Sequence, residues 1–157
     1  MGAPVSAVPN HQVHRTTPLS MRGDVAMAGN LGYELDLTCL PKDDLDLIKA
    51  QIKRYKQIRH IIQLGDFYRL GHPFKDNGTA WQFISQAQDE VVVFYYKVLA
   101  YPQEAFCQLK LQGLDSSSQY IDDLGNRYGG DELMYVGIPI PVLDGDFQSC
   151  SFYFKKI

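Results

Sequence analysis

The 157-residue sequence lacks most of the features that mark nucleic-acid-binding and membrane proteins. It has no basic tract and a net charge of −3, which argues against nucleic acid as a partner. It has no apolar run near the ~20 residues that span a bilayer, so we expect no membrane partner. Met1 is followed by neither a basic stretch nor a long apolar core, and no signal peptide is evident. The compartment stays open between cytoplasmic and secreted.

Cysteine is also scarce. The chain has three cysteines, at positions 39, 107 and 150. Their odd number and wide spacing suit neither a disulfide framework nor a zinc site. We therefore predict free, buried thiols, and we expect neither a metal nor a cofactor.

The most informative stretch present is residues 91–99, with the sequence VVVFYYKVL. It is rich in β-branched and aromatic residues and has no glycine or proline, which predicts a strand. Because side chains alternate along a strand, both of its faces are apolar and both must be covered. We therefore predict a central strand, with the C-terminal two-thirds of the chain folded as a sandwich around it.

The residues before position 65 show a different pattern, in which strands and helices alternate. The expected elements are a strand at 4–8, a helix at 18–28, a strand at 31–37 and a helix at 41–64. This order is typical of parallel β/α units. Two parallel strands do not form a stable sheet alone, because such sheets need cover on both faces. Residues 1–64 are therefore predicted to be an incomplete part of a larger β/α fold.

After Gly65 the pattern changes to short strands separated by turns, which predicts an antiparallel sandwich. The expected strands are 66–70, 80–85, 91–99, 106–111, 120–121 and 147–154, with turns at 75–78 and 129–130 and a helical or extended edge at 133–140.

Four motifs add a family likeness that runs through nearly the whole chain in order. They are SAVPNHQ at 6–12, RGDVAMAGNLGYELDL at 22–37, GDFYRL at 65–70 with YGGDELM at 128–134, and GDFQS at 145–149. Together they resemble the C-terminal end of the retaining α-galactosidases of glycoside hydrolase family 36. The resemblance implies an α+β chain, in which residues 1–64 are the last two β/α units of a (β/α)₈ barrel. Residues 65–157 would then be the C-terminal antiparallel β-sandwich.

The resemblance also implies a chemistry. Members hydrolyse terminal α-galactosyl residues of raffinose-type oligosaccharides with two aspartates, one in a Lys-Trp-Asp motif and one in a Ser-Asp-Asn motif. Neither motif occurs in this sequence, and its one tryptophan, Trp81, lies in the predicted sandwich. We therefore expect no catalytic residue in this chain and no activity from it alone. The implied partners are the missing N-terminal part of the same enzyme and a galactoside substrate, and a homo-oligomer is left open.

Three residues are candidates for contacting the sugar. Active sites of β/α barrels lie at the carboxyl ends of the strands, which places Asn10 and His11 after the first strand and Asp36 after the second. The plainer interpretation is a loop histidine bonded to backbone and an acid hydrogen-bonded beside a strand end. The family usually has a histidine where this chain has Pro4 and a glycine where it has His14.

Two further interpretations stay open. The chain could be a non-catalytic sandwich that binds carbohydrate on aromatic side chains such as Trp81 and Tyr96, although core packing is the usual fate of such residues. It could also be an interaction module with no ligand. The tripeptide Arg22-Gly23-Asp24 matches an adhesion motif, but it falls inside a predicted helix and is not expected to be presented.

Overall fold

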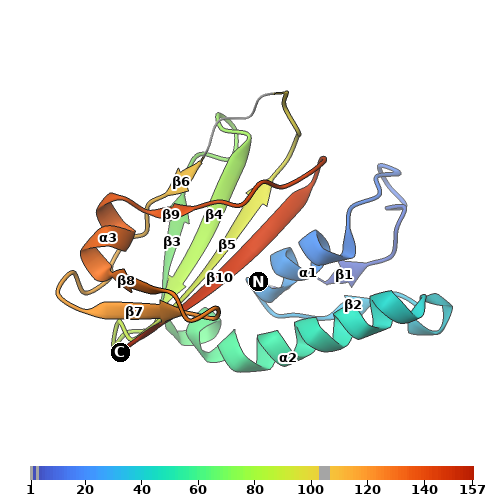
Figure 1. Ribbon diagram of the computed structural model, residues 1–157. Coiled ribbons are helices and arrows are strands. Elements are labelled where there is room, and N and C mark those ends of the chain that lie inside the picture. The colour runs from blue at the N-terminus through green and yellow to red at the C-terminus, as the bar shows by residue number, and fades with distance from the viewer. Residues whose placement is uncertain (1, 3, 103–106) are drawn as a thin grey trace.

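The computed structural model describes residues 2, 4–102 and 107–157 (Figure 1). In chain order the elements are β1 (Val5–Ser6), α1 (Leu19–Met27), β2 (Tyr33–Glu34), the 3-10 turn η1 (Leu37–Cys39), α2 (Lys42–Leu64), β3 (Asp66–Leu70), β4 (Gly78–Ile84), β5 (Glu90–Lys97), β6 (Gln108–Leu109), β7 (Gln119–Asp122), β8 (Arg127–Gly129), α3 (Gly130–Tyr135), β9 (Ile138–Pro139) and β10 (Gln148–Lys156). No helix among these residues is long and apolar enough to cross a bilayer.

The largest element is a six-stranded sheet with the strand order β3-β4-β5-β10-β7-β8. All of its neighbouring strands are antiparallel. Strand β5 pairs with β4 on one side and β10 on the other, so the prediction of a central strand here is confirmed. The strand ends at Lys97, two residues before the predicted end, and Val98 and Leu99 are exposed. Helices α1 and α2 cover one face of the sheet, while the two-stranded sheet β6–β9 and α3 cover the other (Figure 1).

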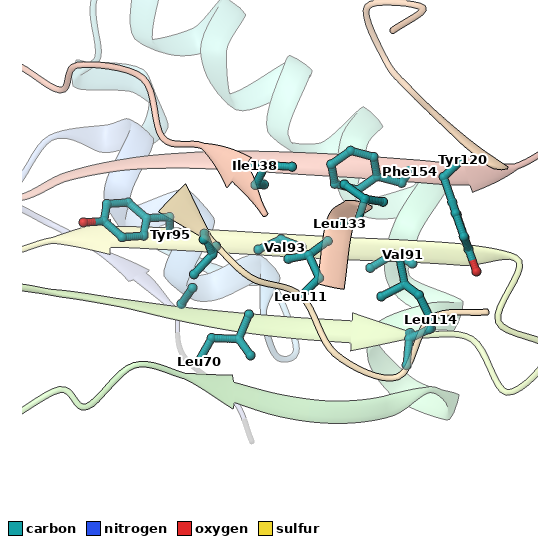
Figure 2. Close-up of a cluster of buried hydrophobic side chains, with 13 residues drawn as sticks. Leu70, Val91, Val93, Tyr95, Leu111, Leu114, Tyr120, Leu133, Ile138 and Phe154 are labelled. Atoms are coloured by element: carbon teal, nitrogen blue, oxygen red, sulfur yellow. The ribbon is translucent and has the colours of Figure 1, made fainter. Parts of the chain in front are cut away.

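The two faces of β5 belong to two separate cores, as the alternation of its side chains requires. Val91 and Val93 pack with Leu133 of α3 and Ile138 of β9, as Figure 2 shows. Val92, Phe94 and Tyr96 point to the other face and pack against Ile58 and Ile61 of α2. Every one of these β5 side chains is at least 90% buried, which explains the doubly apolar sequence pattern.

The first part of the chain forms a small unit of two parallel strands and two helices. Val5 of β1 lies opposite Tyr33 of β2, and this parallel pairing confirms the predicted strand–helix order. A third core packs beneath the strands, with Val5, Leu19, Ala26 and Ile48 as its buried members. The fold class predicted from the sequence, a barrel end followed by an antiparallel sandwich, is therefore confirmed.

Several boundaries differ from the prediction for local reasons. Strand β2 is shorter than 31–37, because the Asp36 carboxylate accepts a hydrogen bond from the Thr38 amide and starts the 3-10 turn. Residues 129–130 are not a turn: Gly129 ends β8 and Gly130 begins α3. The side chain of Glu132 accepts a hydrogen bond from the Gly129 amide, which fixes this start.

The predicted region 133–140 divides into the end of α3 and strand β9. The predicted strand at 106–111 reduces to β6, and Phe106 lies outside the described residues. The prediction of buried thiols is wrong for Cys39 and Cys107, which are exposed on a 3-10 turn and a loop. Cys150 is partly buried in β10, and all three thiols are free.

Candidate functional site

The candidate site lies where β1 and β2 end. Because the two strands are parallel, their carboxyl ends meet at the same edge of the small sheet. The loop of residues 7–18 leaves β1 there, and residues 35–41 leave β2 there (Figure 1). The three residues predicted from the sequence to contact sugar lie on these two segments.

Asn10 folds the first loop. Its side-chain Oδ1 accepts hydrogen bonds from the backbone amides of Gln12 at 3.0 Å and Val13 at 3.1 Å. Its own amide donates to the carbonyl of Arg15 at 2.9 Å, and its carbonyl accepts from the amide of His14 at 2.8 Å. This is the local bonding by which asparagine replaces regular secondary structure in turns. Among the described residues, no hydrogen bond engages its side-chain Nδ2 group.

His11 lies next to Asn10 and is exposed. Its ring makes no hydrogen bond within the part of the chain that the structure describes, so the plainer interpretation of a histidine bonded to backbone is not what is seen. An exposed imidazole beside a strand end is free to donate to, or accept from, a hydroxyl group.

Asp36 is exposed and caps the N-terminal end of the 3-10 turn η1. Its carboxylate accepts hydrogen bonds from the Thr38 amide at 2.9 Å, from the Thr38 hydroxyl at 2.6 Å and from the Cys39 thiol at 3.3 Å. These bonds hold the pKa of Asp36 below its ordinary value, and the bond from the Thr38 hydroxyl has the largest effect. The group is therefore ionised at neutral pH. A carboxylate in this state can accept hydrogen bonds from sugar hydroxyls but is a poor proton donor.

Arg22 on α1 closes the base of the first loop, a role that sequence reasoning missed. Its Nη1 donates to the carbonyl of Ser6 at 2.5 Å, and its Nε donates to the carbonyl of Thr17 at 3.0 Å. One guanidinium therefore joins the two ends of the loop, and its fixed fork geometry suits two carbonyls. Burial lowers the pKa of Arg22, which the charge of Asp44 opposes.

An open depression lies beneath this loop. Its lining comes from the end of β1, the loop and α1: Ser6, Ala7, Val8, Asn10, Val13, Arg15, Thr17 and Arg22. None of these lining residues is a carboxylic acid. Glycoside hydrolysis by retention needs two carboxyl groups about 5–5.5 Å apart, and the depression offers no such pair. The described residues also hold no cluster of three or more metal-binding side chains. The polar side chains of this lining can contact a polar ligand.

Two parallel strands with polar loops at their carboxyl ends, joined to an antiparallel sheet, have the order and direction of neighbouring strands in a β/α barrel enzyme. Comparison with known proteins narrows this class. A family model described as melibiase matches residues 1–65, and one described as the glycosyl hydrolase family 36 C-terminal domain matches residues 78–154. The chain belongs to glycosyl hydrolase family 36 and corresponds to the C-terminal part of its members.

Individual relatives agree. The α-galactosidase AgaA of Geobacillus stearothermophilus is 48% identical over 158 residues, a match that covers 100% of this chain and 22% of that protein. α-Galactosidase 1 of Pediococcus pentosaceus is 41% identical over 157 residues, with 99% of this chain and 21% of that protein covered. The crystal structure of an AgaA variant in complex with raffinose superposes with a TM-score of 0.96 at 47% identity, and covers 100% of this chain and 22% of that one. This chain spans about a fifth of the length of these relatives.

Proposed function

We propose that this chain is the C-terminal part of a retaining α-galactosidase. In this proposal residues 1–64 complete the catalytic (β/α)₈ barrel, and residues 65–157 form the C-terminal sandwich. The observation that carries it is the likeness to α-galactosidases over the full chain, at 48% identity to AgaA. The parallel pair β1–β2 supports the barrel assignment, because its order and direction are those of neighbouring barrel strands.

The catalytic aspartates would lie in polypeptide outside this chain. The sequence has neither a Lys-Trp-Asp nor a Ser-Asp-Asn motif, and the depression beneath the first loop has no carboxylate in its lining. The role of this chain would then be to supply two mouth loops, with Asn10, His11 and Asp36 as sugar contacts, and to cover the barrel with the sandwich. Raffinose-type galactosides are the proposed substrates, because the AgaA variant is a complex with raffinose.

The test is an assay of the chain alone, and of the full-length protein that contains it, on an aryl α-galactoside and on raffinose. We expect turnover by the full-length protein and none by the chain alone. Proton NMR of the first sugar released should show the α-anomer, because two displacements at the anomeric carbon retain its configuration. Turnover by the chain alone would overturn the assignment of the catalytic pair to other polypeptide.

A second candidate function is a sugar-binding sandwich. One observation favours it: Phe67 on edge strand β3 is 48% exposed and lies in an open depression with Trp81 and Phe83. Calorimetric titration of the chain with galactose and raffinose discriminates the two. Millimolar or tighter binding that is lost in Trp81→Ala supports the binding module; no binding supports a structural sandwich.

A further inference from the structure

A cation–π contact joins the loop of residues 7–18 to the sandwich. The guanidinium carbon of Arg15 lies 4.9 Å from the centre of the Phe147 ring. A cation at this distance over an aromatic face is attracted by the negative face of the ring. The contact joins the segment after barrel strand β1 to the segment that leads into β10, more than 130 positions further along the chain.

The Phe147 ring is held in place by its own backbone. The Phe147 amide donates to the carbonyl of Val98 at 2.9 Å, at the end of β5. The neighbouring Asp146 carboxylate accepts a hydrogen bond from the Ala100 amide at 2.7 Å. Phe147 also has a φ of 54°, a left-handed conformation that is rare for a bulky residue. The backbone at Phe147 is therefore fixed by neighbouring hydrogen bonds and is strained, so the direction of the ring is set by the sandwich.

Arg15 in turn belongs to the hydrogen-bonded core of the loop. Its carbonyl accepts from the Asn10 amide at 2.9 Å, so Arg15 closes the turn that Asn10 begins. Arg22 fixes the two ends of the same loop from α1. An Arg15 held on the Phe147 ring thus restrains the middle of the loop, which contains Asn10 and the exposed His11.

We propose that Phe147 and Arg15 are positioning residues for the galactoside site, through which the sandwich sets the conformation of the first mouth loop. This rests on the proposed function, in which that loop faces the sugar. The sandwich then has a part in substrate binding although none of its residues contacts the sugar at this loop. The expected signature is a weaker substrate complex with little change in the chemical step, because Phe147 lies outside the reacting groups.

The first test uses the full-length protein and needs no substrate. Amide hydrogen exchange of residues 12–14 is compared in the unsubstituted protein, Phe147→Gly, Phe147→Tyr and Arg15→Ala. Glycine removes the ring while suiting the left-handed backbone, and tyrosine keeps the ring. We expect exchange about two- to fivefold faster in Phe147→Gly and Arg15→Ala and unchanged in Phe147→Tyr, as an exposed cation–π pair allows. Val142→Ala, an exposed position in the same connecting segment, is the matched control.

The second test uses the same variants in the full-length protein with an aryl α-galactoside. We expect KM to rise about two- to fivefold in Phe147→Gly and Arg15→Ala, with kcat changed less than twofold, and both constants restored in Phe147→Tyr. The double variant should be no worse than either single one. Equal exchange in Phe147→Gly and the unsubstituted protein, or an unchanged KM, overturns the proposal. Absence of turnover by the unsubstituted protein overturns the proposed function instead, and the exchange test still decides whether the sandwich restrains the loop.

Discussion

The carboxylate of Asp24 on α1 accepts a hydrogen bond of 2.6 Å from the hydroxyl of Ser149 on β10, although 125 residues separate the two. The Tyr96 hydroxyl of β5 donates to the backbone carbonyl of the same aspartate at 3.1 Å. Helix α1 is therefore tied to the two central strands of the six-stranded sheet by polar bonds within an otherwise apolar contact. The aspartate of the tripeptide 22–24 is thus turned inward, which agrees with the interpretation that the motif is not presented.

The burial of Asp24 makes stability depend on pH. Burial raises the pKa of Asp24 to about 6, although the Ser149 hydrogen bond and the charge of Arg54 oppose the shift. The folded protein therefore keeps a proton on Asp24 that the unfolded chain, with a pKa of about 3.9, releases first. This contribution to stability is full below pH ~4 and is lost as the pH rises through about 6. Its size is at most about 3 kcal/mol, since one pKa unit is ~1.4 kcal/mol.

Urea unfolding between pH 4 and pH 8 checks this. We expect the free energy of unfolding of Asp24→Asn to fall less over this range than that of the unsubstituted chain, because asparagine does not titrate. Ser149→Ala removes a donor to the ionised form, so its loss of stability should extend to higher pH. Identical pH profiles for Asp24→Asn and the unsubstituted chain would show that Asp24 is not the titrating group.

Gly23 is needed for packing within α1. A Cβ at this position would lie 2.1 Å from the side-chain nitrogen of Gln51. Gln51 is 5% exposed, donates to the Leu19 carbonyl at 3.0 Å and accepts from the Tyr33 hydroxyl at 2.8 Å. Alanine would favour the helix by about 1 kcal/mol, but displacing a buried, doubly bonded amide costs about 1–3 kcal/mol per lost bond. With both bonds lost, we expect Gly23→Ala to destabilise the chain by about 1–5 kcal/mol.

Chemical denaturation of two variants measures this effect. The control is Gly32→Ala, since a Cβ there meets no atom within 4 Å, and its free energy of unfolding should change by less than about 0.5 kcal/mol. If Gly23→Ala were as stable as Gly32→Ala, Gln51 would have an alternative position that keeps its bonds.

The stability of a Trp81 variant distinguishes a role in core packing from a role in ligand binding. Its ring meets the Tyr96 ring edge-on with centroids 5.0 Å apart, and it is only partly buried. Phe94, its cross-strand partner, is fully buried. We expect Phe94→Ala to cost about 3–5 kcal/mol and Trp81→Ala to cost less, in thermal or urea unfolding. If Trp81→Ala lowered the free energy of unfolding as much as Phe94→Ala, Trp81 would be a core residue and not part of an open binding surface.

The sequence predicted most of the fold where burial alone decides it. The doubly apolar pattern of residues 91–99 specified a central strand, and strand β3 matches its predicted range of 66–70. Both short strands were predicted too long, and for β2 the reason is local: the Asp36 carboxylate accepts a hydrogen bond from the Thr38 amide and begins a 3-10 turn. Strand patterns show which residues are apolar but not where a hydrogen-bonded turn interrupts them.

The candidate site was predicted less completely. The strand-end rule selected Asn10, His11 and Asp36, and all three do lie on segments that leave the same sheet edge. It missed Arg22 and Arg15, because their partners are backbone carbonyls and an aromatic ring far away in the sequence. Neither partner leaves a local sequence signal. The one available hint was the uncommon tripeptide at 22–24, which has a structural explanation at each position.

The left-handed conformation of His14 gives the last prediction. Its φ is 53°, and its amide donates to the Asn10 carbonyl at 2.8 Å, so the turn requires this backbone. Glycine would fit at this position, because it adopts positive φ without the ~1–2 kcal/mol that other residues incur. We expect His14→Gly to be neutral or to stabilise the chain by up to about 1 kcal/mol, and His14→Val to destabilise it by about 1–2 kcal/mol, because branching at Cβ worsens the clash.

His11→Gly, at a position in the same loop without this conformation, should instead destabilise by about 0.5–1 kcal/mol through the entropy of the unfolded chain. Urea unfolding of the three variants measures all of these differences, and a His14→Gly variant less stable than His11→Gly would show that the imidazole itself stabilises the loop.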